Sequence, residues 1–193
     1  VIVKTAWDGL VPAVQSGVID AIIAGMSPIP SRREAIDFSE SYYHNDIVLG
    51  MVVKKGGAYE SAKSLADFAD AKITGQLATF HYDVIDQIEG VQKQTALGTF
   101  PAMIVALNSG AIDGYVSERP GAESAVEANP GLTYISFAEG EGFEASPEDV
   151  AIAVGLAKGS ALTAEVNEIL AGIDREARQT LMDEAIARQP LAE

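Results

Sequence analysis

The stretch Ile19–Arg32 reads IDAIIAGMSPIPSR and decides the fold class. Its first part is a short apolar run rich in isoleucine, which predicts a buried strand over 19–24. Residues 25–30 contain a glycine and two prolines, which oppose both helix and sheet and therefore predict a loop. Ser31 then predicts a helix N-cap, with Glu34 as its capping-box partner. A strand, a loop and a helix in this order are typical of α/β folds.

The same alternation continues along the rest of the chain. Apolar runs predict further strands, and helical spacing of apolar residues predicts helices. The expected strands cover 1–3, 47–53, 72–77, 111–116, 132–137 and 150–156. The expected helices cover 7–16, 65–68 after Ser64, 82–88, 100–108, a segment that begins near Pro120, and two amphipathic pieces in 161–187. Strands that alternate with helices predict mostly parallel sheets flanked by helices.

Two short segments resemble each other and suggest two lobes. Residues 13–21 read AVQSGVIDA and residues 105–114 read VALNSGAIDG, so both predict a helix, a Ser-Gly break and a strand. The likeness is short enough to arise by chance, or it marks the same corner in two similar lobes. Glycine-containing connections at 56–60 and 139–143 flank one inner block. We therefore expect lobe 1 to combine 1–50 with 145–193, lobe 2 to cover 51–144, and two crossings to form a hinge.

The charge balance limits the partners of the chain. Its 193 residues include 28 acidic and 13 basic side chains, for a formal net charge of −15. Such a chain repels phosphate, so we expect neither nucleic acid nor anionic lipid as a partner, although solubility alone also explains the charge. The absence of cysteine excludes disulfides, thiolate zinc sites and a cysteine nucleophile. No apolar run approaches the roughly 20 residues of a membrane span. The chain opens with residues that predict a strand, so the missing signal peptide is uninformative.

The loop after the first buried strand is the strongest candidate binding site. Ligands of open α/β sheets bind at the carboxyl ends of the strands, where this loop is expected. Ser27 offers a hydroxyl, and Arg32 offers a planar guanidinium that can hold a carboxylate bidentately. Free N–H groups at the start of the helix also favour an anion. The alternative is that Ser31 only caps the helix and Arg32 is only a surface charge.

Further candidates follow two later strands. Glu118 can pair with a ligand ammonium, or it can be an ordinary surface partner of Arg119. Thr79 and His81 lie where a strand runs into a helix, at the expected mouth of a cleft. The alternative for His81 is a satisfied surface or cap histidine.

Catalytic and metal-binding motifs are absent from the sequence. His44 and His81 are the only histidines, so no metal-ligand cluster is expected, and no phosphate loop or nucleophile elbow is found. We expect no cofactor. Trp7, the only tryptophan, fits the core of an amphipathic helix, or it packs on a ligand stem or stacks on a cation.

Five motifs carry a resemblance to a known family. They are residues 7–14 (WDGLVPAV), 19–27 (IDAIIAGMS), 32–39 (RREAIDFS), 42–43 (YY) and 112–118 (IDGYVSE). Together they resemble the polar amino-acid solute-binding proteins of ABC importers, family 3 of the extracellular solute-binding proteins. The resemblance covers the chain from Val1 to about Ala187.

The resemblance implies a two-lobed fold of the type II periplasmic-binding class that closes on an amino acid without transforming it. It further implies delivery to the membrane permease subunits of an importer, and a periplasmic or lipid-anchored location with a signal or lipoprotein segment. It assigns ligand contacts to Trp7, Gly25, Ser27, Arg32, Gln76, Thr79, His81 and Glu118. Arg32 would hold the α-carboxylate, with Ser27 and the Gly25 backbone beside it. Glu118 would hold the ammonium, although the family more often has Asp there.

Within the resemblance, Thr79 offers its hydroxyl and backbone N–H from the second lobe, and Trp7 packs on the ligand's side chain. Gln76 and His81 are expected to read that side chain.

The chain departs from the family at its front. The resemblance implies a further strand and helix in lobe 1, and this unit is absent, so the chain is a fragment or another chain supplies the strand. A monomer is expected, while the bared sheet edge also allows a swapped dimer. Two other functions stay open: a dehydratase acting on a small carboxylic acid, with His81 or Glu118 as its acid or base, and the ligand-sensing domain of a receptor.

Overall fold

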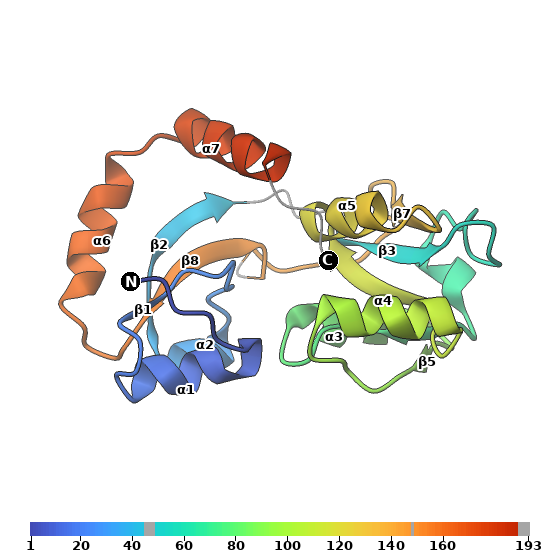
Figure 1. Ribbon diagram of the computed structural model, residues 1–193, viewed down its shortest axis with the longest axis horizontal. Coiled ribbons are helices and arrows are strands. Elements are labelled where there is room, and N and C mark those ends of the chain that lie inside the picture. Colours follow the sequence, from blue (N-terminus) through green and yellow to red (C-terminus); the bar gives the residue numbers. More distant parts are fainter. Residues whose placement is uncertain (45–48, 148, 189–193) are drawn as a thin grey trace. The chain divides into compact units, whose positions relative to one another are not determined.

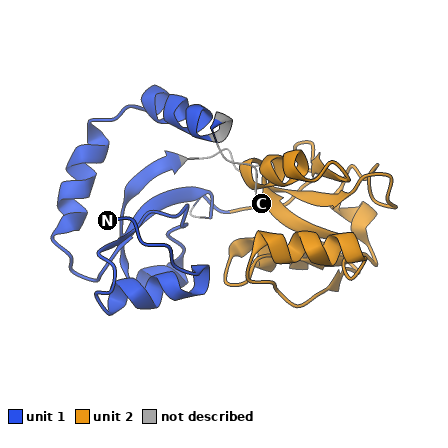
Figure 2. Ribbon diagram, viewed as in Figure 1, with its two compact units in different colours: residues 1–46, 146–188 blue, residues 47–145, 189–193 orange. Residues whose placement is uncertain are grey.

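The structure, a computed structural model, describes residues 1–44, 49–147 and 149–188. The chain divides into two compact units, drawn in separate colours in Figure 2. Unit 1 joins Val1–Asp46 to Ser146–Arg188, and unit 2 takes in Ile47–Ala145. Each unit has its own sheet and its own buried core. The mixed α/β class expected from the sequence is therefore confirmed.

The sheet of unit 1 has the order β1 (Ala21–Ile22), β8 (Ala151–Leu156), β2 (Asp37–His44). Both neighbouring pairs are antiparallel, so the expectation of a mostly parallel sheet is wrong for this unit. Register shifts interrupt the β2–β8 pair. At these points, serine hydroxyls on β2, in place of backbone carbonyls, accept hydrogen bonds from backbone N–H groups of β8. The backbone N–H of Val154 donates to Ser39 Oγ at 3.0 Å, and that of Ile152 donates to Ser41 Oγ at 3.2 Å.

Helices of unit 1 cover this sheet (Figure 1). They are the 3-10 helix η1 (Trp7–Gly9), which continues into α1 (Leu10–Gln15), and α2 (Pro30–Ala35), α6 (Leu162–Ala171) and α7 (Arg175–Ala187). The core under α1 and α2 consists of Leu10, Val14, Ile22, Met26, Ile36, Phe38 and Ala153. Asn167 on α6 accepts from the Glu40 backbone N–H at 2.7 Å, and Arg178 on α7 donates to the Ser41 carbonyl at 3.1 Å. These bonds tie both helices to β2.

The sheet of unit 2 mixes strand directions. Its order is β5 (Gln92–Lys93), β4 (Lys72–Thr74), β6 (Gly114–Glu118), β3 (Leu49–Lys54), β7 (Leu132–Ser136). β4 is parallel to β5 and β6, whereas β3 is antiparallel to β6 and β7. The expected parallel arrangement thus holds for only one side of this sheet.

The central strand β3 is buried on both faces because its side chains alternate between two clusters. Met51 and Val53 pack with Phe68 on η2 (Leu65–Phe68), with α3 (Phe80–Asp83) and with η3 (Val84–Gln87). Val52 points the other way, to the cluster with α4 (Phe100–Ser109) and α5 (Arg119–Ala128). Helical elements therefore cover both faces, as an apolar strand requires.

Several local predictions need correction. Residues 1–3 form no strand, and Val1 and Ile2 are fully exposed. The strand predicted over 19–24 is reduced to β1. Ser31 does not cap α2, because the helix begins at Pro30 with Ile29 at the N-cap position. The helix predicted over 82–88 is the α3–η3 pair.

Other local signals are confirmed. Ser64 forms a capping box with Asp67 at η2, and Pro120 lies at the start of α5.

Two strands differ from the prediction. β6 begins only at Gly114, three residues after the predicted start of that strand. The strand β2 was not predicted at all.

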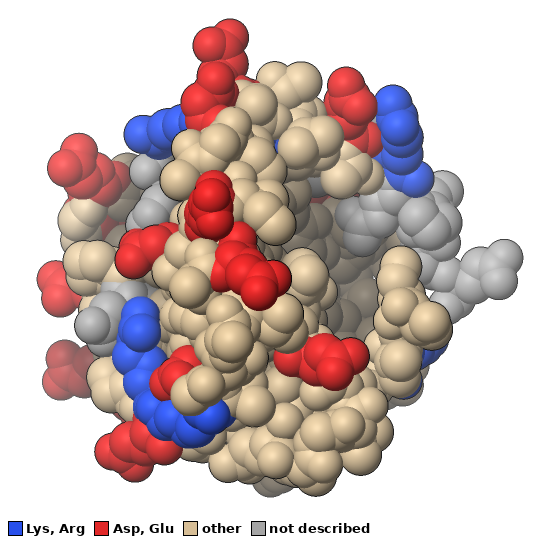
Figure 3. Space-filling view, turned by 90° about the vertical axis from the view of Figure 1, so that its left-hand side faces the viewer, with Lys and Arg blue, Asp and Glu red and all other residues tan. Residues whose placement is uncertain are grey.

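Acidic side chains outnumber basic ones on the face drawn in Figure 3. Figure 3 shows the face that carries α6, on which Asp and Glu side chains are spread widely and Lys and Arg are fewer. Within the described ranges, no helix has the length and apolar character needed to cross a membrane. The same residues contain no group of three or more His, Asp or Glu side chains suited to a metal ion.

Candidate functional site

The loop between β1 and α2 in unit 1 holds two of the predicted contacts. Gly25 has a φ of +71°, a left-handed conformation that glycine adopts without a steric cost. Its backbone hydrogen-bonds Tyr42 on β2, whose pKa is raised by burial. Ser27 is 4% exposed, and its hydroxyl donates to the Asp149 carbonyl at 2.6 Å. The Ser27 hydroxyl therefore holds the loop to the segment before β8.

Arg32 is held on two sides by unit 1. One of its guanidinium nitrogens, Nη1, donates to the Ser27 carbonyl at 2.9 Å, and the guanidinium carbon lies 5.5 Å from the centroid of the Trp7 ring. Both side chains are half-buried, and Trp7 also packs against the core. Trp7 therefore packs on the core, as one of its two predicted roles requires, and also supports the Arg32 guanidinium. A guanidinium with its direction set in this way suits a carboxylate.

In unit 2, a loop leads from the end of β4 to α3 and holds the next two predicted contacts. Gln76 forms an isolated parallel bridge with Leu97. The buried Thr79 donates its hydroxyl to the Gln76 carbonyl at 2.8 Å and precedes α3 as its N-cap residue, without a side-chain cap bond. Ala78 between them has a φ of +59°. The hydroxyl of Thr79 thus closes a tight turn around a left-handed residue.

Gly75 lets the start of α3 lie against the end of β4. A Cβ atom at this position would lie 2.8 Å from the His81 carbonyl oxygen and 2.9 Å from the Tyr82 nitrogen, both backbone atoms. Sequence reasoning missed Gly75 and Ala78 as determinants of the site. A glycine directly after a strand could have indicated the first, since it often marks close backbone approach. Nothing in the sequence indicates a left-handed alanine.

His81 and Glu118 lie together in unit 2. His81 is 5% exposed, and its Nε2 lies 3.7 Å from Oε2 of Glu118, the last residue of β6. Neither ring nitrogen has a hydrogen-bond partner among the described residues. The alternative interpretation of His81 as a satisfied surface or cap histidine is therefore wrong. Glu118 is one-third exposed, so its carboxylate reaches both the buried ring and the surface of the unit.

The structure thus brings the predicted residues together in two groups. Unit 1 holds Trp7, Gly25, Ser27 and Arg32, and unit 2 holds Gln76, Thr79, His81 and Glu118. The first group presents a cation and the second an anion. These are the charges that complement the two ends of a free amino acid.

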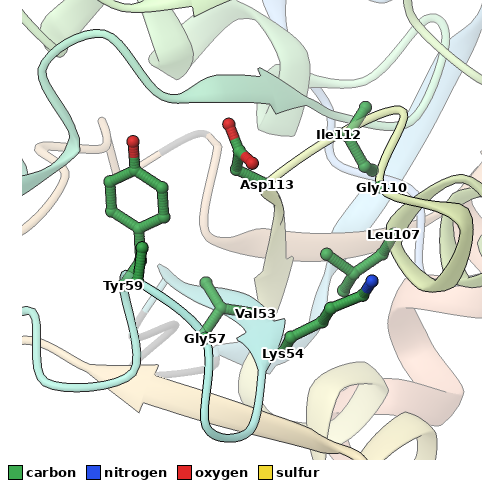
Figure 4. Close-up of a pocket in the computed structure, with 9 residues that line it drawn as sticks. Val53, Lys54, Gly57, Tyr59, Leu107, Gly110, Ile112 and Asp113 are labelled. Carbon is green, nitrogen blue, oxygen red and sulfur yellow. The ribbon is translucent and has the colours of Figure 1, made fainter.

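Hollows apart from these groups are found in both units. One of about 280 Å³ in unit 1 is lined by Tyr42, Tyr43, Ile173, Arg175, Arg178 and Gln179. Unit 2 has a cavity of about 90 Å³ around Lys54, Tyr59 and Asp113 (Figure 4), which is small beside the roughly 300 Å³ at which ligand pockets begin. Unit 1 has a groove of about 350 Å³ lined mainly by apolar side chains of β2, α6 and α7, including Tyr42 and Leu181. None of the eight predicted contacts lines any of these hollows. The cavity of unit 2 is too small, and the 350 Å³ groove is too apolar, for a polar amino acid.

Proteins described as amino-acid-binding proteins are similar in sequence to most of this chain. A probable histidine-binding protein from Campylobacter jejuni is 33% identical over 145 residues, which are 73% of this chain and 54% of that protein. The arginine-binding protein 1 of an Escherichia coli ABC transporter is 28% identical over 127 residues, which are 66% of this chain and 50% of that protein. The chain spans about half the length of the curated relatives it matches.

The similar solved structures are also those of amino-acid-binding proteins. The substrate-binding protein of a Streptococcus pneumoniae amino acid ABC transporter, bound to L-arginine, is 26% identical with a TM-score of 0.80. The similarity covers 96% of this chain and 75% of that protein. An ancestral arginine-binding protein bound to arginine is 28% identical with a TM-score of 0.76, over 94% of this chain and 78% of that protein.

The family assignment follows from a match along nearly the whole chain. The sequence profile of the bacterial extracellular solute-binding proteins, family 3, matches residues 1–184. This span contains both sheets and both groups of predicted contacts. The chain therefore belongs to family 3 of the bacterial extracellular solute-binding proteins.

Proposed function

We propose that this chain captures a free polar amino acid outside the cytoplasm and delivers it to the membrane subunits of an ABC importer. The observation that carries the proposal is Arg32, half-buried and held by the Ser27 carbonyl and the Trp7 ring, as the carboxylate-binding cation. Glu118 in unit 2 is the proposed partner of the ammonium group. Histidine and arginine are the first ligands to test, because similar proteins carry those names.

The two units act, in this proposal, as lobes that close on the ligand, with hinges near 50 and 145. The contacts are Trp7, Gly25, Ser27, Arg32, Gln76, Thr79, His81 and Glu118. Because the Ser27 hydroxyl is engaged by Asp149, Ser27 contributes through its backbone or after rearrangement of that bond. The protein acts as a monomer, binds no nucleic acid and releases its ligand unchanged. Its location is periplasmic or lipid-anchored.

A thermal-shift screen against the twenty amino acids and several small carboxylic acids tests the function. A ligand at one hundred times its dissociation constant stabilises the folded state by about 2.7 kcal/mol, which is a shift of about 5–10 °C at this chain length. We expect such a shift with one or a few polar amino acids, and mass spectrometry should recover the ligand unchanged. No shift with any amino acid, or a new product, would contradict the proposal.

The Arg32→Ala variant tests the site, and Arg33→Ala is its matched control. Both arginines lie on α2, donate to a backbone carbonyl and cover an aromatic ring, with Arg33 Nε 2.7 Å from the Pro28 carbonyl oxygen and its guanidinium over Phe38. Loss of a charge-assisted bidentate pair should weaken binding by several kcal/mol in Arg32→Ala. Arg33→Ala should bind within about threefold of the wild type. Equal affinities in the two variants would mean that Arg32 is not the carboxylate partner.

A further inference from the structure

His81 is a buried base without a conventional partner. Its side chain is 6% exposed, and neither Nδ1 nor Nε2 finds a hydrogen bond among the described residues. A buried polar group left in this state lowers stability, so its presence invites a functional explanation. The Phe80 ring lies 4.6 Å from the His81 ring, centroid to centroid, and supplies no polar atom.

Glu118 is the ion-pair partner of His81 among the described residues. On β6, the Glu118 Oε2 atom lies 3.7 Å from Nε2, within ion-pair range. On α3, Asp83 is exposed, and the ring of Tyr82 faces the Lys93 ammonium at 4.2 Å. No other ion pair to His81 occurs within the described part of the chain. A charge on the imidazole would therefore act directly on Glu118, while the neighbouring Arg119 hydrogen-bonds Tyr134.

We propose that His81 couples proton uptake to ligand release by competing for the Glu118 carboxylate. The inference rests on the proposed function, in which Glu118 binds the ligand ammonium. When the ring is neutral, the one-third exposed carboxylate is available to the ammonium. When the ring is protonated, it pairs with Glu118 and repels the ammonium.

The competition predicts the direction in which pH changes ligand affinity. The ligand and the proton bind to the same pair of side chains in opposition, so ligand binding expels a proton. The dissociation constant for an amino acid then rises as pH falls, by at most about tenfold per pH unit for one displaced proton. A carboxylic acid without an ammonium group does not compete in this way. In this coupling His81 acts through Glu118, in addition to its proposed contact with the ligand.

Isothermal titration calorimetry in buffers of different ionisation enthalpy measures the expelled protons directly. With L-arginine, which has no group of its own that titrates between pH 5.5 and 7.5, the wild type should release up to one proton per ligand in this range. His81→Gln and Glu118→Gln should both bind more weakly than the wild type, Glu118→Gln the more so because it loses the ammonium partner. At ligand concentrations that saturate each variant, binding should proceed without proton release, and Glu118→Gln leaves the buried ring in place. His44→Gln, which removes the other histidine of the chain, is the matched control and should release protons like the wild type.

Each outcome decides the inference. Proton release that is lost in both His81→Gln and Glu118→Gln and kept in His44→Gln supports it. Wild-type binding without proton release, or release that persists in His81→Gln, overturns the inference and leaves the proposed function intact. No binding of any of the twenty amino acids at any of these pH values overturns the proposed function, and the inference with it.

Discussion

The guanidinium carbon of Arg32 lies 5.5 Å from the centroid of the Trp7 ring, so the only tryptophan of the chain supports the proposed carboxylate-binding cation. The two residues come from different elements, η1 and α2, and Trp7 of η1 and Ala35 of α2 pack against the same core cluster. Stacking of this kind contributes about 0.5–2 kcal/mol, depending on desolvation. It restricts the guanidinium before a ligand arrives, which lowers the entropy lost on binding.

The Trp7→Ala variant should therefore weaken amino acid binding by about 0.5–2 kcal/mol, or roughly 2- to 30-fold. Trp7→Phe keeps an aromatic face and should lose less than Trp7→Ala. Calorimetry measures both affinities, and circular dichroism checks that each variant is folded. Equal losses in the two variants would show that the aromatic face does not support Arg32. In the wild type, ligand addition should also change the fluorescence of Trp7.

Local signals predicted the beginnings of several elements but not the pairing of strands. Ser64 and Pro120 act through hydrogen bonds and backbone angles within a few residues, so their effects can be read from the sequence. Strand β2 was missed because its stability depends on β8, more than one hundred residues away. Ser39 and Ser41 serve there as acceptors for β8 N–H groups, and polar residues carry no strand signal of their own.

The residues of the candidate site could be predicted from the sequence, but their burial and their contacts with one another could not. Arg32 and Glu118 could be selected because their positions after strands and their charges suit an amino acid. The burial of His81 depends on Gly75, which lets α3 approach β4, and on the position of β6. Both conditions depend on how separate helices and strands pack together. No spacing in the sequence distinguishes a buried imidazole from an exposed one at this position.

The Gly75→Ala variant should destabilise the protein by about 1–3 kcal/mol, the usual range for overpacking. Its Cβ would meet backbone atoms of His81 and Tyr82 within 3 Å, and backbone cannot rotate away as a side chain can. Urea unfolding measures the loss. Gly131→Ala in the same unit meets no atom within 4 Å and should change the free energy of unfolding by less than about 0.5 kcal/mol. Equal effects of the two substitutions would contradict the close approach of α3.

The Ala78→Gly variant should raise the free energy of unfolding by up to about 1 kcal/mol. A left-handed conformation costs an L-residue about 1–2 kcal/mol, and glycine replaces that cost with a smaller entropic one. Ala78 has a φ of +59°. Ala102→Gly, on the exposed first turn of α4, should instead destabilise by about 0.5–1 kcal/mol. A loss of stability in both variants would argue against a left-handed residue at 78.

Asp37 joins the start of β2 to the turn after β8. Its Oδ2 accepts from the Gly159 N–H at 2.7 Å, and its Oδ1 accepts from the Lys158 ammonium at 2.9 Å. The Gly159 hydrogen bond, followed by the contact with Lys158, lowers the pKa of Asp37 below its ordinary value of 3.8. A carboxyl with a pKa lowered by folding stabilises the native state above its unfolded pKa. This contribution is lost as pH falls through the folded value.

The Asp37→Asn variant should therefore unfold at lower urea than the wild type at pH 7, and the difference should shrink as pH falls below about 4. At neutral pH the wild-type carboxylate is ionised and paired, whereas in acid it is protonated and resembles the amide. Urea midpoints at pH 7, 5, 4 and 3 measure the trend. Asp86→Asn is the matched control, because the Asp86–Lys93 pair is also 2.9 Å long but its carboxylate is 72% exposed. An exposed pair contributes little, so that variant should follow the wild type. A constant difference between Asp37→Asn and the wild type at all four pH values would mean that the substitution acts through shape and not through the ionised carboxylate.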